Sequence, residues 1–213
     1  MIQSDKFDSS NKDMKKLLNS LLIFTIKRLI EIFGFLTFCI GILLLTALIS
    51  YSPDDPNFIF PENTEIKNML GFRGSHISDL FFQSVGLIAY LIPITFILTG
   101  INVFKKKEIF LLIENIFFII LYVIIGSIFF SVYYQNNFTL YINGSGGFIG
   151  NFFNEKFFSG RDIFNQNFFY YFFILLILIL FLISINFRLN NFVDSIRKII
   201  QLLLKKNSKN YTN

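Results

Sequence analysis

The chain has 213 residues, of which 54% are hydrophobic and only 15% are charged, and its net charge is +5. A soluble domain carries about a quarter charged residues, whereas here the apolar residues form long uncharged blocks, as in membrane proteins. One cysteine, Cys39, and one histidine, His76, exclude a disulfide framework and a metal cluster built on His or Cys. The composition therefore predicts an integral membrane protein without a cofactor or metal.

The first 28 residues form a polar and basic segment that we expect to lie in the cytoplasm. Residues 1–20 (MIQSDKFDSSNKDMKKLLNS) are mixed in charge. The apolar block that follows is too long for the hydrophobic region of a signal peptide. This segment is therefore not expected to be a cleaved leader.

Four blocks are long enough to cross a bilayer as helices, which takes about 20 apolar residues. They cover residues 29–50, 80–103, 109–133 and 168–187. In hydrocarbon the backbone must bond internally, and uninterrupted apolar runs do not fit the alternation of barrel strands. The predicted fold class is all-α: a polytopic membrane protein with a four-helix domain over 29–187.

Small residues inside these blocks indicate where helices approach one another. Thr37 and Gly41 in the first block are four residues apart, as are Ser127 and Ser131 in the third. Pro93 is expected to kink the second block. The run FFILLILILFLI in the fourth block has no small face and is expected to contact lipid.

Lysine and arginine predict the orientation of the spans. Fifteen of the 19 basic residues fall in the N-terminal segment, in the short loop with Lys105, Lys106 and Lys107, and in the C-terminal segment. The two longer loops together have four. Since basic residues accumulate on the cytoplasmic side, both termini are expected in the cytoplasm and the two longer loops outside.

The first block ends in the stretch YSPDDPNF, residues 51–58. Pro53 and Pro56 fix φ and disfavour helix at the residue before each, so the span must stop here. Asp54 and Asp55 are costly to place in hydrocarbon, and we expect them to anchor the turn in the outer interface. Two interpretations stay open: the turn only ends a helix, or it also directs an outer loop that contacts a partner.

The C-terminal segment, residues 188–213, is basic and amphipathic. In FVDSIRKIIQLLLKK (192–206) the apolar residues share one helical face and most charges lie opposite. This pattern favours a helix that lies on an anionic inner leaflet. A helix that packs on a protein partner is the alternative.

Three stretches, ISYSPDDPNF (49–58), NMLGFRGSHISDLFFQSVGLIAYLIP (68–93) and GGFIGNFF (146–153), together resemble the N-terminal four-helix membrane domain of FtsK/SpoIIIE-type DNA translocases. The resemblance covers roughly residues 27–188. The matching positions are Tyr51, Pro53, Asp55, Pro56, Asn68, Gly71, Gly74, Asp79, Pro93, Gly146, Gly147 and Gly150.

The resemblance implies a membrane anchor of the bacterial division apparatus, in the inner membrane at the septum. Its implied partners are membrane lipids, divisome membrane proteins, further copies of the chain in a hexamer, and a cytoplasmic motor if one is encoded separately. Direct contact with nucleic acid is not expected.

The sequence departs from the family in lacking a motor. A phosphate-binding loop requires Gly-Lys, and no glycine here is followed by lysine. The stretch GSGGFIG (144–150) fails the dinucleotide pattern at Ile149. We therefore expect no enzymatic activity and no DNA pumping by this chain alone. Whether it is a stand-alone protein, half of a split gene or a truncated frame stays open.

A small transport or channel subunit is the alternative function. Against it, the spans lack paired intramembrane charges, and only the second contains a proline. Glu114, near the cytoplasmic edge of the third block, is either a functional intramembrane carboxylate or an interfacial partner of the nearby lysines.

Overall fold

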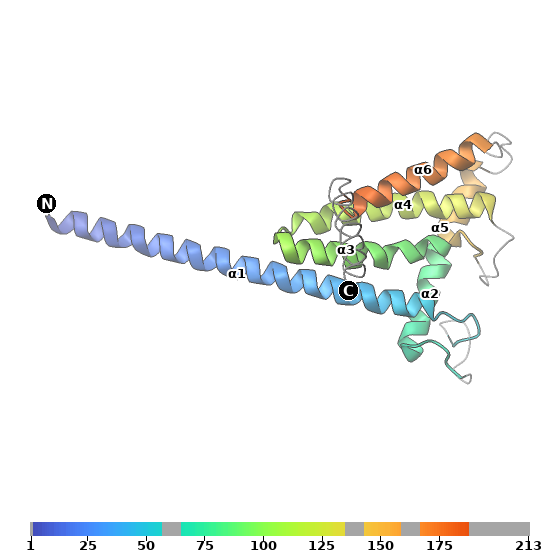
Figure 1. Cartoon of the computed structure of the whole chain (residues 1–213), viewed down its shortest axis with the longest axis horizontal. Coiled ribbons are helices and arrows are strands. Elements are labelled where there is room, and N and C mark those ends of the chain that lie inside the picture. The colour runs from blue at the N-terminus through green and yellow to red at the C-terminus, as the bar shows by residue number, and fades with distance from the viewer. Residues whose placement is uncertain (1, 57–64, 135–142, 159–166, 188–213) are drawn as a thin grey trace, which may run out of the picture.

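The computed structural model describes residues 2–56, 65–134, 143–158 and 167–187, with side chains from Met14 onward. Within these ranges every regular element is helical, and four helices are long and apolar enough to cross a membrane. They form a bundle with short elements gathered at one end (Figure 1). The predicted all-helical fold with four candidate spans is confirmed, and the sidedness of the loops stays a prediction. The tail predicted to be an amphipathic helix, 188–213, lies outside the described residues.

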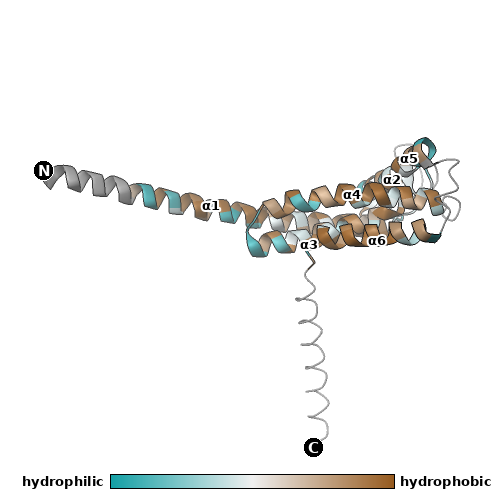
Figure 2. Ribbon diagram, turned by 90° about the horizontal axis from the view of Figure 1, so that it is seen from above, coloured by the Kyte–Doolittle hydropathy of each residue, from teal (hydrophilic) through white to brown (hydrophobic). Residues whose placement is uncertain are grey.

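Helix α1 (Ile2–Ile49) is one continuous helix that begins well before the predicted span 29–50. Its 48 residues correspond to roughly 70 Å at about 1.5 Å per residue, more than twice the thickness of a bilayer's hydrocarbon core. Figures 1 and 2 show its N-terminal part projecting beyond the bundle. The other helices therefore pack only against the part of α1 nearest Ile49.

The second candidate span is divided into α2 (Gly71–Val85), the 3₁₀ turn η1 (Gly86–Tyr90) and α3 (Leu91–Lys106). Gly86 has a φ of 72°, a conformation that residues with a side chain rarely adopt, and α2 turns away from the bundle axis here (Figure 1). Pro93 lies in the first turn of α3, where its missing N–H is not needed. The second block is therefore bent, as expected, but the bend lies at η1, in the turn just before Pro93, and not at Pro93 itself.

Helices α1 and α3 approach closely at glycines. A Cβ on Gly34 would lie 2.7 Å from the backbone nitrogen of Phe104, and one on Gly100 would lie 2.5 Å from that of Phe38. Gly41, a small residue expected at a helix contact, also faces α3. The seam between the two helices thus depends on the absence of side chains at these positions.

Helix α4 (Phe110–Tyr133) packs between α3 and α6 (Asn167–Ser184). A buried apolar cluster, which includes Leu48, Phe82, Ile88 and Tyr122, joins α1, α2, η1 and α4. Helix α6 buries only Phe173 and Ser184, and its surface is strongly apolar (Figure 2). That exposure agrees with the expectation that the fourth span contacts lipid.

Two further short elements, α5 (Gly147–Phe153) and the π-helical turn η2 (Asn154–Phe158), lie at the end of the bundle beyond the bend. Helix α5 contacts both α2 and α4. The start of the second candidate span and the short element α5, which are far apart in the sequence, thus lie at the same end of the bundle (Figure 1).

Candidate functional site

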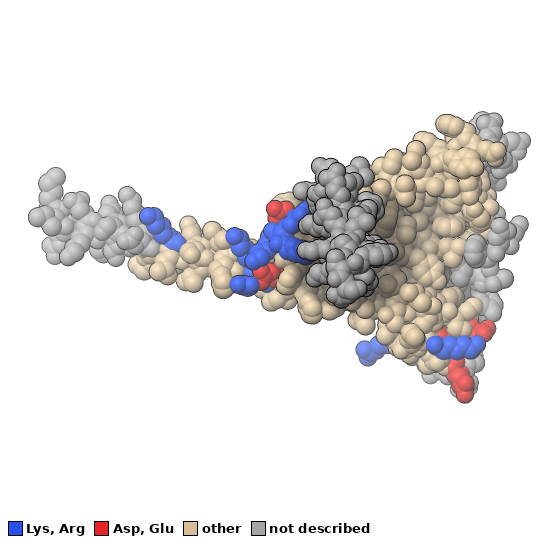
Figure 3. All heavy atoms as spheres, viewed as in Figure 1, with Lys and Arg blue, Asp and Glu red and all other residues tan. Residues whose placement is uncertain are grey.

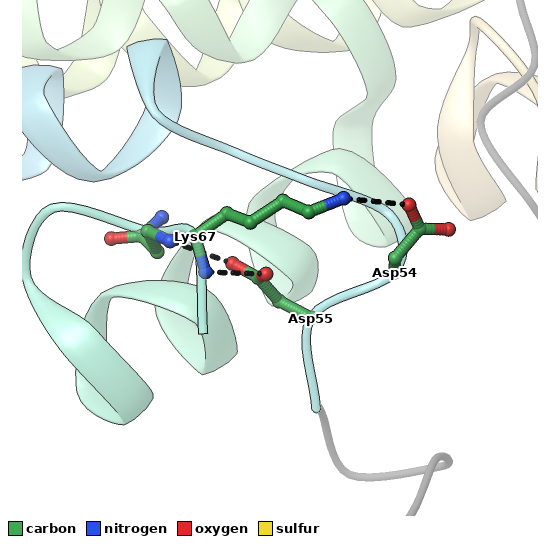
Figure 4. Close-up of polar contacts among 4 residues, drawn as sticks. Asp54, Asp55 and Lys67 are labelled. Atoms are coloured by element: carbon green, nitrogen blue, oxygen red, sulfur yellow. Dashed lines mark hydrogen bonds and ion pairs between the residues drawn. The ribbon is translucent and has the colours of Figure 1, made fainter. Parts of the chain in front are cut away.

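Asp55 binds the far side of the loop that follows α1. Its two carboxylate oxygens accept hydrogen bonds from the backbone N–H groups of Lys67 and Asn68, each at 2.8 Å (Figure 4). Asp55 is 1% exposed, so it holds the turn through buried backbone contacts, and its expected place in the outer interface stays a prediction. Only Asp54 is exposed, where it pairs with the Lys67 ammonium at 3.1 Å. A buried carboxylate is tolerated here because both its oxygens are satisfied.

Asn68 holds the same loop against the end of α1. Its side-chain amide donates to the carbonyls of Ala47 at 2.9 Å and Ser50 at 3.3 Å. The last carbonyls of a helix have no partner within the helix, so Asn68 satisfies one of them, that of Ala47, and also the carbonyl of Ser50 just after the helix, from a position about 20 residues along the chain. We call Asp55, Asn68 and the backbone groups that they bind the loop clasp.

The start of α2 fits around the loop clasp. Gly71 begins the helix with a φ of 63°, and a Cβ on Gly74 would overlap the side-chain oxygen of Asn68. One turn further on, the Tyr51 hydroxyl donates to the buried Asp79 carboxylate at 3.3 Å. The predicted motif positions before and within α2 therefore meet in one place, although they are spread over 29 residues.

The two prolines of the exit turn lie beside the loop clasp. Pro56 is buried, and its carbonyl accepts a hydrogen bond from the Ser75 hydroxyl at 2.7 Å. Pro53 is half-buried. Helix α1 has already ended at Ile49, four residues before Pro53.

The glycines of the GGFIG stretch (146–150) approach Gly86 and form a second close contact. We call the four residues Gly86, Gly146, Gly147 and Gly150 the glycine junction. Gly147 has a φ of 64°, and a Cβ there would lie 2.5 Å from the backbone nitrogen of Gly86. Gly146 and Gly150 face the backbone of Ser127 in α4. Ser127, one of the small residues expected at a helix contact, thus lies against α5. Its hydroxyl also donates to the Val85 carbonyl at 2.8 Å.

A charged cluster lies at the opposite end of the bundle, where α1 leaves it (Figure 3). Glu31 of α1 pairs with Lys107 at 2.7 Å and with Arg28 at 2.6 Å. The predicted topology residues Lys105, Lys106 and Lys107 are all exposed here. Sequence reasoning missed Glu31, although its spacing of three residues from Arg28 on a helix is a signal for an ion pair.

A chain of polar side chains attaches the end of α6 to the bundle. Asn186 donates to the side-chain oxygen of Asn115 at 2.7 Å, and Asn115 donates to the Thr99 hydroxyl at 2.8 Å. Sequence reasoning missed these residues because each is an isolated polar residue in or beside an apolar block. Glu114, which precedes Asn115 in the sequence and is a candidate intramembrane carboxylate, is exposed on α4.

These groups hold backbone segments in position. The described residues contain no group of three or more His, Cys, Asp or Glu side chains that could hold a metal ion. Pro93 lies apart from both the clasp and the junction, against Gly41 of α1. The arrangement can present a fixed surface next to the bundle, formed by α2, α5 and the clasp.

The model of one protein family, the 4TM region of DNA translocase FtsK/SpoIIIE, matches residues 26–197, which is more than half of the chain. No solved structure matches the chain.

Curated relatives are similar over shorter stretches. The DNA translocase FtsK of Rickettsia bellii is 35% identical over 68 residues, covering 32% of this chain and 9% of the relative. That of Azospirillum brasilense is 32% identical over 88 residues, covering 40% and 14%. That of Shewanella oneidensis is 35% identical over 86 residues, covering 39% and 9%. The chain therefore matches only a small part of the length of these relatives.

Proposed function

Because the chain belongs to the family of the 4TM region of DNA translocase FtsK/SpoIIIE, we propose that it anchors an FtsK-like cell-division and chromosome-segregation translocase in the bacterial inner membrane. In this role it brings the translocase to the division septum, contacts membrane proteins of the divisome and supports assembly of a homo-oligomer. The DNA pumping itself belongs to a cytoplasmic motor.

The observation that carries this proposal is the family match over residues 26–197, which includes three of the four candidate spans in full and most of the first. The loop clasp supports it, because motif positions quoted for the family converge on one rigid element. Beside the clasp, apolar side chains are available to a partner: Met69, just before α2, is 78% exposed, and Leu80 of α2 is 54% exposed. A surface of this kind, fixed by buried hydrogen bonds, suits contact with another membrane protein.

The proposed orientation places both termini and the Lys105–Lys107 loop in the cytoplasm, and the loop clasp and glycine junction outside. The distribution of basic residues supports it, with the charged cluster at one end of the bundle and the clasp at the other (Figure 3). After Cys39→Ser, single cysteines at positions 62, 106 and 143 can be labelled with an impermeant reagent from the periplasmic side. Labelling at 62 and 143 is expected, and labelling at 106 instead would reverse the orientation.

The septal role is tested with a cytoplasmic fluorescent fusion of this chain in dividing bacteria. We expect fluorescence to gather at mid-cell during constriction without any attached motor. Asp55→Ala should reduce this recruitment at equal membrane levels, whereas Asp54→Ala, which changes an exposed neighbour, should not. Uniform peripheral fluorescence of the unaltered chain would contradict the anchor role and favour a transport function.

A further inference from the structure

An apolar groove follows the seam between α1 and α3, toward the end of the bundle that carries the charged cluster. Its volume is about 150 Å³, similar to that of an apolar protein cavity that accepts a benzene-sized molecule. It is lined by Gly34, Phe35, Phe38, Gly100, Ile101, Phe104 and Lys105.

The glycines of the seam explain why the groove exists. Gly34 and Gly100 contribute no side chains where the backbones of α1 and α3 approach, so the backbones themselves form the floor of the groove. Phe35 and Phe104, which are 57% and 50% exposed, stand beside it on the two helices. Every lining residue except Lys105 is apolar, so the groove favours a hydrocarbon chain over a polar ligand.

Two lysines lie at the charged end of the groove. Lys105 is part of the lining. Lys27 lies seven residues before Gly34 in the same helix, which places it on nearly the same face about 10 Å further along. Glu31 already binds Arg28 and Lys107. Among the described residues, neither Lys27 nor Lys105 has a carboxylate within ion-pair distance.

We propose that the groove and these two lysines form a binding site for an anionic phospholipid. Part of one acyl chain lies in the groove between α1 and α3, and the phosphate of the headgroup lies between Lys105 and Lys27. Lys105 lies at the edge of the groove, and Lys27 lies about 10 Å beyond Gly34, which suits the headgroup layer that borders the hydrocarbon core. Basic pockets between membrane helices are suited to anionic headgroups in this way. The site requires only that the chain spans a bilayer, so it does not depend on the septal role.

The test measures how strongly the purified full chain in vesicles prefers spin-labelled phosphatidylglycerol over phosphatidylcholine with the same labelled acyl chain. We expect the unaltered chain to prefer phosphatidylglycerol. Lys105→Gln and Lys27→Gln should each reduce that preference by about fivefold, the effect of one basic residue near an anionic lipid. Lys106→Gln is the matched control, because it removes the same charge from a residue that does not line the groove. It should leave most of the preference intact.

Three results would overturn the proposal. An equal loss for Lys106→Gln and Lys105→Gln would mean that the preference comes from diffuse surface charge. Displacement of the labelled lipid by millimolar glycerol 3-phosphate would mean that the lysines bind a free phosphate and that the groove takes no chain. Ile101→Trp, which fills the groove and leaves both lysines in place, should weaken the binding of both labelled lipids. Unchanged binding in this variant would also contradict the site.

Discussion

The loop clasp and helix α6 are held in place by opposite means. In the clasp, Asp55 and Asn68 are almost fully buried, and their side-chain atoms bind particular backbone groups. Helix α6 buries only Phe173 and Ser184. Its remaining side chains mostly face outward as an apolar surface, and its firm polar contacts are near its ends.

The difference shows where residue identity matters in this chain. A buried carboxylate that accepts two backbone hydrogen bonds cannot be replaced by a residue of similar size without leaving donors unsatisfied. A leucine that faces lipid contacts hydrocarbon whether or not the helix is packed. Changes in the clasp should therefore be far more damaging than changes of similar size on α6.

Removal of the Asp55 carboxylate should have the largest effect. Asp55→Ala loses two buried hydrogen bonds to a charged acceptor, and should lower the free energy of unfolding by about 3–5 kcal/mol. Unfolding of the purified chain in detergent micelles measures this loss. Asp54→Ala is the control, since the Asp54–Lys67 pair is exposed and should contribute less than about 1 kcal/mol. Equal losses in the two variants would show that the clasp does not stabilise the fold.

Changes at the bend between α2 and α3 should have the second largest effect on stability. Gly86→Ala forces a side chain into a φ of 72° and into contact with the Ser145 carbonyl, and should cost about 2–4 kcal/mol. Gly71 is the matched control, because its φ is 63° but a Cβ there would meet no atom within 4 Å. Gly71→Ala should cost only the backbone strain, about 1–2 kcal/mol. If both variants lose the same stability in the same unfolding assay, α5 does not pack tightly against the bend.

The sequence predicts the four spans well because each is a long apolar run, which is a local property. It also points to Asp55, Asn68 and the glycines as a set. It does not reveal that Asp55 is buried, since a charged residue after a span is ordinarily exposed at the interface. It predicts a bend in the second block because a proline is visible in the sequence, but it does not show that the bend lies at η1, where Gly86 has a positive φ.

Polar contacts between residues far apart in the sequence could not be predicted from the sequence either. Asn68 caps the end of α1 from about 20 residues away, and Asn115 binds Asn186 across 71 positions. Nothing in the local pattern of either residue indicates its partner. Such pairs depend on how the helices pack, which apolar periodicity alone does not determine.

The attachment of the end of α6 should have a smaller effect than the clasp. Asn186→Ala removes the hydrogen bond to Asn115, and should cost about 1 kcal/mol, as hydrogen bonds between membrane helices usually do. A double-mutant cycle with Asn115→Ala measures the coupling between the two residues. Full additivity of the two losses would show that the 2.7 Å contact contributes nothing.

The lipid-facing surface of α6 should have the smallest effect. Leu175 is 55% exposed, and Leu175→Ala should change the free energy of unfolding by less than about 0.5 kcal/mol, because its methyl groups contact lipid in the folded and the unpacked helix alike. Leu48, fully buried in the core, is the matched control, and Leu48→Ala should cost about 2–5 kcal/mol. Converting several α6 leucines to Ile or Val should likewise leave both stability and septal recruitment unchanged. A loss for Leu175→Ala close to that for Leu48→Ala would mean that a protein partner, rather than lipid, covers this face. Helix α6 would then be a second candidate surface for contact with membrane proteins, beside the surface proposed next to the clasp.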